Sequence, residues 1–148
     1  MPERGILVEN VRRSFGAAHA VRDVSFTARA GAVTGLVGPN GSGKTTLLLM
    51  LASLLRPDAG TIRINGLDPS TATAEVRAQL GWMPDALGAW PSLSVHDTLV
   101  TTARLYDLPR AAADARATEL LTRVGLSELA KVQARVLSRG PNQLLGLA

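Results

Sequence analysis

Residues 38 to 45 (GPNGSGKT) have the residue types and spacing of a phosphate-binding loop, G-x-x-x-x-G-K-[ST]. Glycines let the backbone curl so that successive N–H groups point at phosphate oxygens, and the N-terminus of a following helix adds a partial positive charge. In such a loop Lys44 reaches the β and γ phosphates, and the hydroxyl of Thr45 binds Mg²⁺, a cation that prefers oxygen ligands. The alternative is a glycine-rich turn followed by a coincidental lysine.

The flanks of the loop decide between these interpretations, because a phosphate-binding loop needs a strand before it and a helix after it. Residues 33 to 37 are a short apolar run, which predicts a strand buried on both faces. Residues 44 to 55 (KTTLLLMLASLL) hold no glycine or proline and are apolar almost all round, which predicts a helix within the core. Pro57 and Gly60 end it. Both flanks favour the phosphate-binding interpretation.

Further strands are predicted from near-alternating patterns bounded by turn residues. Residues 5 to 12 and 20 to 28 predict a hairpin or meander with a turn near Phe15 and Gly16. Residues 61 to 64 predict a strand followed by a tight turn, because the next two residues, asparagine and glycine, tolerate positive φ. Residues 80 to 83 predict another strand.

Helices are predicted from capping signals in the second half of the chain. Asp68, followed by proline, predicts the start of a helix that ends near residue 79. Ser94 and Asp97 have the spacing of a capping box and predict a helix to about residue 106. A third helix is predicted from Pro109 to residue 124, with Gly125 at its C-terminal cap. The predicted elements follow the order strands, then a central helix, then mostly helices. This order favours a mixed sheet with a helical arm over residues 94 to 140.

Composition excludes several classes of function. The chain has 148 residues, 46% of them hydrophobic and 19% charged, which suits one globular domain or part of one. Without cysteine there is no disulfide, thiolate metal site or thiol catalysis, and His19 and His96 lie too far apart in sequence to suggest a histidine metal cage. The net charge of +4 comes from scattered arginines without interleaved aromatic residues, so nucleic acid is not an expected partner. No apolar run approaches the roughly 18 residues of a membrane span, and a cytosolic location is expected.

The loop GPNGSGKTT after AVTGLVG resembles the Walker A loop of the ATP-binding cassette (ABC) transporter family. The resemblance implies an α/β fold of the P-loop NTPase type, with a mixed sheet core, an N-terminal antiparallel β part and a C-terminal helical subdomain. It also implies ATP and Mg²⁺ as ligands, and an aromatic residue stacked on adenine at the position of Phe15, although a core phenylalanine at a strand end is the alternative. The nucleotide-binding residues that it implies are Phe15, Gly38, Asn40, Gly41, Ser42, Gly43, Lys44, Thr45 and Thr46.

The stretch LGWMPDALGAWPSLSVHDTL resembles the Q-loop region of that family, residues 84 to 93 here. Asp85 stands where the family has a glutamine that contacts Mg²⁺ and transmits the nucleotide state to a membrane partner. A carboxylate is a good Mg²⁺ ligand, but aspartate is shorter than glutamine. The alternative for Asp85 is a loop aspartate that caps a turn.

The C-terminal stretch LSRGPNQLLGLA resembles the family's signature motif. The resemblance implies that this segment meets the γ-phosphate bound to a second protomer, which requires a homo- or heterodimer. The alternative is an ordinary serine-capped helix. The signature residues are Ser138, Arg139, Gly140 and Gln143.

Taken together, the resemblance predicts the first portion of one ABC-type ATP-binding domain. Its parts are a β part (1–37), a P-loop core (38–83), the Q-loop region (84–93) and a helical arm with the signature (94–148). The family's hydrophobic strand ending in Asp-Glu, and its later histidine, have no counterpart among the 148 residues. Three hypotheses follow: an ATPase subunit of a transporter, held by a transmembrane permease subunit on the cytoplasmic face of the membrane; a nucleotide-binding remnant without turnover; or a gene fragment that folds poorly.

Overall fold

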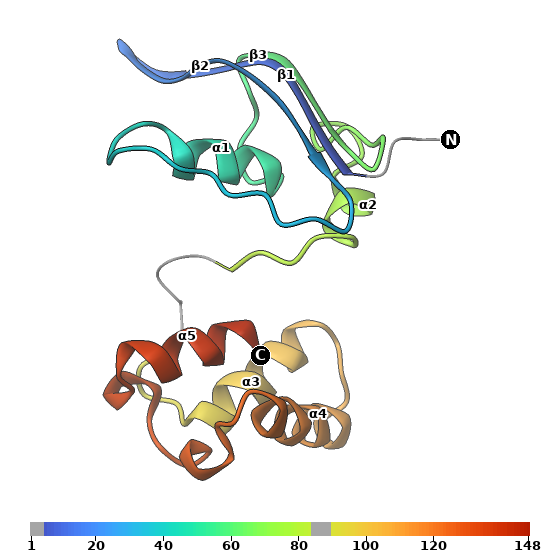
Figure 1. Ribbon diagram of the computed structural model, residues 1–148. Coiled ribbons are helices and arrows are strands. Elements are labelled where there is room, and N and C mark those ends of the chain that lie inside the picture. The colour runs from blue at the N-terminus through green and yellow to red at the C-terminus, as the bar shows by residue number, and fades with distance from the viewer. Residues whose placement is uncertain (1–4, 84–89) are drawn as a thin grey trace. The chain divides into compact units, whose positions relative to one another are not determined.

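The computed structural model describes residues 5–83 and 90–148. The chain forms two compact units, Met1–Trp82 and Met83–Ala148, which are described separately (Figure 1).

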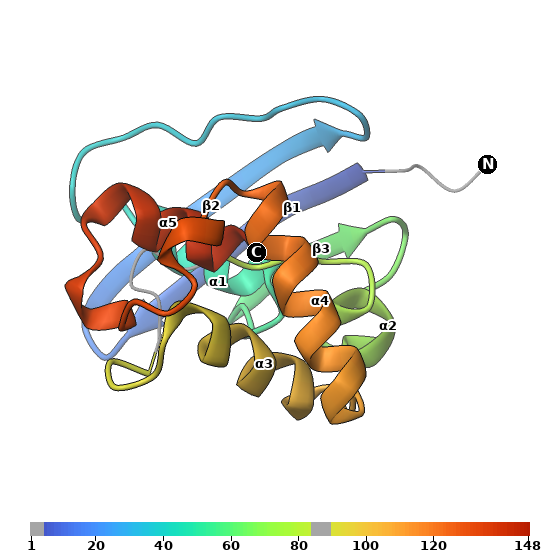
Figure 2. The ribbon, with the colours of Figure 1, turned by 90° about the horizontal axis from the view of Figure 1, so that it is seen from below.

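The first unit contains a three-stranded antiparallel sheet. Its strands are β1 (Gly5–Phe15), β2 (Ala18–Arg29) and β3 (Ala59–Ile64). β1 is the central strand, in the order β2-β1-β3, as Figure 2 shows. A two-residue turn joins β1 to β2, which confirms the predicted hairpin. The predicted strand and turn at residues 61 to 66 are confirmed as well, because Asn65 and Gly66 both have positive φ after β3.

Helix α1 (Lys44–Leu51) packs one face against this sheet. Leu47 and Met50 are buried in a cluster with apolar side chains of all three strands. The predicted burial all round is wrong, because Leu48 is 39% exposed. The predicted extension to residue 55 is also wrong: Ser53 takes the left-handed conformation (φ 58°), which stops the helix. The start of the helix at Lys44 is as predicted.

The prediction of a buried strand at residues 33 to 37 is wrong. The segment has no regular secondary structure, and Val33 and Val37 are almost fully exposed, the latter at 94%. An apolar strand becomes buried on both faces only when other strands pair with it and helices cover it. The sheet of the described residues holds β1, β2 and β3 alone, so none of its strands pairs with this segment. The glycine loop is therefore preceded by an extended but unpaired segment, visible between β2 and α1 in Figure 1.

Two predictions between β3 and residue 83 are also wrong. Residues 80 to 83 do not form a strand. Helix α2 spans only Thr73–Arg77 and begins later than predicted. Asp68 explains the delay, because its carboxylate accepts the amide of Ser70 at 2.8 Å and so forms a local turn instead of a helix start.

The second unit is helical. It comprises α3 (Val95–Leu105), α4 (Arg110–Arg123), two 3₁₀ turns (Ser127–Leu129 and Ala134–Val136) and α5 (Arg139–Leu147). Both predicted helices are confirmed: the Ser94 hydroxyl caps α3 by accepting the Asp97 amide at 3.0 Å, and Gly125 follows α4 with positive φ. The core of this unit comprises Val95, Leu99, Ala117, Leu121, Leu126, Ala134 and Leu145. No helix in the described ranges is both long and apolar enough to cross a membrane.

Candidate nucleotide-binding site

The glycine loop turns back on itself before α1. Gly41 and Gly43 both take the left-handed conformation, with φ of 81° and 85°, and the Ser42 amide donates to the Pro39 carbonyl at 3.2 Å. Gly43 is also the N-cap of α1, and it provides no side-chain cap for the first-turn amides. These amides have no partner within the helix, so they give its N-terminus a partial positive charge suited to an anion.

Glycine is required at position 43 for a second reason, which is close packing against β2. A Cβ atom at this position would lie 2.0 Å from the Ala20 carbonyl oxygen and 3.3 Å from a methyl carbon of Val21. Real Cβ atoms essentially never approach other atoms within 3.0 Å. The start of α1 is therefore placed directly against the start of β2, and the hairpin helps to position the loop.

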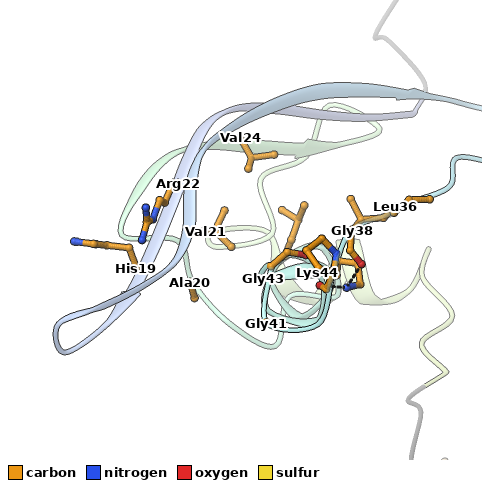
Figure 3. A pocket seen from close by; sticks show the side chains of 14 residues that line it. His19, Ala20, Val21, Arg22, Val24, Leu36, Gly38, Gly41, Gly43 and Lys44 are labelled. Carbon is orange, nitrogen blue, oxygen red and sulfur yellow. Dashed lines mark hydrogen bonds between the residues drawn. The ribbon is translucent and has the colours of Figure 1, made fainter.

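The side chain of Lys44 folds back into the loop. Its Nζ donates to the carbonyl oxygens of Gly38 at 2.8 Å and Pro39 at 2.7 Å, as the dashed lines in Figure 3 show. The ammonium group thus lies against the start of the glycine loop. Carbonyl acceptors satisfy its protons without neutralising its charge, so the positive charge remains available to an anionic ligand.

A cavity of about 520 Å³ lies between this loop and β2. Its volume falls within the range of roughly 300 to 1,000 Å³ typical of small-molecule sites. Three of its lining residues, His19, Arg22 and Lys44, carry basic side chains, and no carboxylate is among the described residues that line it. Figure 3 shows His19 and Arg22 on the hairpin, across from Lys44. The full lining is His19, Ala20, Val21, Arg22, Val24, Leu36, Val37, Gly38, Pro39, Gly41, Ser42, Gly43, Lys44 and Leu47.

Five of the sequence-predicted residues line this cavity: Gly38, Gly41, Ser42, Gly43 and Lys44. The other four predicted nucleotide-binding residues do not line it. Asn40 lies in the loop, and Thr45 and Thr46 lie in the first turn of α1, where Thr45 is exposed. Phe15 is 50% exposed at the end of β1, which argues against the alternative of a core phenylalanine.

The sequence patterns did not indicate the hairpin residues that line the cavity, which are residues 19 to 22 and Val24 of β2. They match no phosphate-binding motif, because they lie at the start of β2, where they pair with β1 and are far from the loop in sequence. The predicted hairpin could have indicated them in part. In that hairpin Ser14, next to Phe15, pairs with His19, so an adenine site at Phe15 would have neighbours at the start of β2.

Asp85 lies outside the described residues. The signature residues form the N-terminal end of α5 in the second unit, and all four are exposed. Ser138 is the N-cap of this helix, but its side chain makes no capping hydrogen bond. Pro141 fits the first turn, where an amide hydrogen has no helical partner, and the first helical bond runs from the Asn142 amide to the Ser138 carbonyl at 3.1 Å.

Comparisons with known proteins agree on one family. The profile of the ABC transporter family matches residues 21–148. The chain is 32% identical over 139 residues to the linearmycin resistance ATP-binding protein of Bacillus subtilis, covering 94% of this chain and 45% of that protein. It is 36% identical over 148 residues to the doxorubicin resistance ATP-binding protein of Mycobacterium tuberculosis, covering 99% of this chain and 45% of that protein. The chain thus spans a little under half the length of these relatives.

Solved structures support the same fold. The structure of cbiO1 from Clostridium perfringens, part of an ABC transporter complex, matches with a TM-score of 0.80 at 23% identity, over 98% of this chain and 60% of that one. An ATP-binding cassette of an ABC transporter in its ADP conformation matches with a TM-score of 0.79 at 23% identity, over 97% of this chain and 62% of that one. The expected fold class, α/β with an antiparallel β part and a helical subdomain, is confirmed.

Proposed function

The chain belongs to the ABC transporter family, as an ATP-binding protein, and from that premise we propose that it binds Mg-ATP at residues 38–46 as the nucleotide-binding part of a transporter. The observation that carries the proposal is the placement of Lys44. Its ammonium contacts the start of the loop of turned backbone, Lys44 lines a cavity of about 520 Å³, and the helix that begins at Lys44 has no side-chain cap. Such an arrangement suits the triphosphate of a nucleotide.

In the proposed complex Lys44 binds the β and γ phosphates, and the loop amides bind the remaining phosphate oxygens. Mg²⁺ fits the residues present, because the exposed Thr45 offers a hydroxyl oxygen on the first turn of α1 and Mg²⁺ typically takes few protein ligands together with phosphate oxygens. Bound there, Mg²⁺ would neutralise phosphate charge. Asp85 is proposed as a second ligand.

Phe15 is proposed to stack on the adenine base. Its ring is half exposed at the end of β1, and it lies four residues before His19, which lines the cavity. A stacked aromatic ring contributes roughly 1 to 3 kcal/mol per base without reading the base by hydrogen bonds. Affinity in this proposal therefore comes from both ends of the nucleotide.

The proposed cycle needs two further partners. A second ATP-binding protomer would receive the exposed signature residues at the start of α5, with Ser138 and the helix N-terminus meeting the γ-phosphate in trans. A transmembrane permease subunit would hold the protein on the cytoplasmic face of the membrane and respond to ATP-dependent dimerisation through the segment around Asp85. Dimer closure by ATP and reopening after hydrolysis would drive transport.

A second candidate function is nucleotide binding without turnover. Attack by water needs a positioned base within hydrogen-bond reach, and no described residue that lines the cavity has a carboxylate. The two candidates share the binding step and differ in whether ATP is consumed, so phosphate release measured with and without Lys44 separates them.

Isothermal titration of the full chain with Mg-ATP tests the binding proposal. Charge-assisted hydrogen bonds contribute roughly 1.5 to 3 kcal/mol, so Lys44→Ala is expected to weaken affinity by about 10- to 150-fold. Arg63→Ala is the matched control, because it also removes one positive charge but from an exposed position on β3. Equal affinity of the wild-type and Lys44→Ala proteins for Mg-ATP would refute the proposal.

A further inference from the structure

Arg13 lies over the ring of Phe15. The guanidinium carbon is 4.8 Å from the centroid of the ring, within the distance at which a cation interacts with an aromatic face. The two residues are two positions apart on β1, so their side chains leave the same face of the strand. Arg13 is only 24% exposed, whereas the ring is half exposed. One face of the ring is therefore covered by a cation.

The guanidinium is held in place by Asp58, which follows α1 and precedes β3. Nη1 of Arg13 donates to Oδ1 of Asp58 at 2.5 Å, and the Ser14 amide donates to Oδ2 at 2.7 Å. The Asp58 amide in turn donates to the Arg12 carbonyl at 2.8 Å. Asp58 is thus fixed to the backbone of β1 on both sides of Arg13, and it restricts where the guanidinium can lie.

The ionised state of the Asp58 carboxyl favours its pairing with the Arg13 guanidinium. The pKa of the Asp58 carboxyl lies below its ordinary value chiefly because the Ser14 amide donates to it; burial opposes this effect, and the hydrogen bond and charge of Arg13 lower the pKa further. Nε of Arg13 is buried and has no hydrogen-bond partner among the described residues. Hydrogen bonds therefore hold the guanidinium on its Asp58 side only, and the Phe15 ring lies 4.8 Å from its carbon.

We propose that Arg13 is a positioning residue for the nucleotide base: anchored by Asp58, it holds the Phe15 ring by one face so that the other face stacks on adenine. The inference rests on the proposed function, in which Phe15 contacts the base. A ring fixed beforehand loses less conformational freedom on binding than one that rotates freely. Arg13 acts through Phe15 and does not touch the phosphates, so its effect is confined to ligands that carry a base.

The test compares Mg-ATP with inorganic tripolyphosphate, which has the phosphates but no base. Arg13→Gln is expected to weaken Mg-ATP binding by about two- to fivefold and to leave tripolyphosphate binding unchanged. Arg13→Lys keeps a cation and is expected to retain part of the difference. Arg12→Gln is the matched control, because Arg12 pairs with Asp23 at 3.4 Å at the surface instead of with the ring, and it should change neither affinity.

A double-mutant cycle with Phe15→Leu isolates the contact. If Arg13 acts through the ring, Arg13→Gln has no further effect on Mg-ATP affinity once the ring is gone. Equal losses for Mg-ATP and tripolyphosphate, or losses that add fully in the Phe15→Leu background, would overturn the inference by showing a general structural role. A different result would refute the proposed function itself: an unchanged affinity for tripolyphosphate in the Lys44→Ala variant.

Discussion

Gly43 offers a sharp test of how the loop is built, because two separate costs arise when it gains a side chain. In Gly43→Ala the residue must keep a left-handed backbone, at φ 85°, which costs an L-residue roughly 1 to 2 kcal/mol. Its methyl group would also lie 2.0 Å from the Ala20 carbonyl oxygen, about 1 Å closer than real contacts allow. Since that oxygen belongs to the backbone of β2, it cannot rotate away, and α1 must shift.

Forced shifts of this kind cost roughly 1 to 3 kcal/mol, so the total expected loss of stability for Gly43→Ala is about 2 to 5 kcal/mol. Gly41→Ala separates the two costs. Gly41 has nearly the same backbone, at φ 81°, but no atom within 4 Å of the position of an added Cβ. It should therefore lose only the backbone cost, roughly 1 to 2 kcal/mol.

Urea unfolding followed by hydrogen exchange in peptides from β1 and β2 measures the stability of the first unit. The expected order is wild type, then Gly41→Ala, then Gly43→Ala, with at least about 1 kcal/mol between the two variants. Equal losses in the two variants would refute the inference that α1 is seated directly on the Ala20 carbonyl.

Three further predictions concern stability. Ser94→Ala removes the cap that accepts the Asp97 amide, so the second unit should lose about 1 kcal/mol in a urea titration, and an unchanged midpoint would contradict the cap. Met50→Ala should cost about 2 to 5 kcal/mol, whereas Val37→Thr should stay within about 0.5 kcal/mol, because only the former side chain is buried; a large loss for Val37→Thr would show that residues 33 to 37 are packed after all. The pKa of Asp58 is lowered on folding, so its stabilising contribution is present above the ordinary value of about 3.9 and is lost as pH falls through the folded value. The stability gap between the wild type and Asp58→Asn should therefore be wider at pH 6 than at pH 3, and a gap independent of pH would refute the ionised anchor.

Local signals in the sequence predicted the elements that depend on local interactions. Ser94 and Asp97 define the start of α3 because a capping box is a contact between residues three positions apart. The hairpin of β1 and β2 follows for a similar reason, since a two-residue turn brings the strands together whatever lies elsewhere. The turned backbone of the loop could be predicted from its glycines, because Gly41 and Gly43 adopt the left-handed conformation that favours glycine.

Predictions that needed distant partners failed or missed residues. The apolar residues 33 to 37 indicate a buried strand only when pairing strands are present, and none of the described strands pairs with them. The miss at Asp68 has a local cause instead: its carboxylate could cap a helix or a turn, and it accepts the amide of Ser70, two residues away, which forms the turn. The roles of Ala20 at the loop and of Asp58 beneath Arg13 rest on contacts between residues 23 and 45 positions apart, which no local pattern reveals.

The proposed function depends on residues 38 to 46, whose turned backbone and one ammonium group are proposed to bind a triphosphate. Amide NMR spectra of the chain, recorded with and without Mg-ATP, test it at the atoms concerned. We expect the largest shift changes at the amides of residues 41 to 46, and we expect the Lys44→Ala spectrum to change little with the same ligand. Unchanged loop amides at millimolar Mg-ATP, or the largest changes outside the first unit, would contradict it.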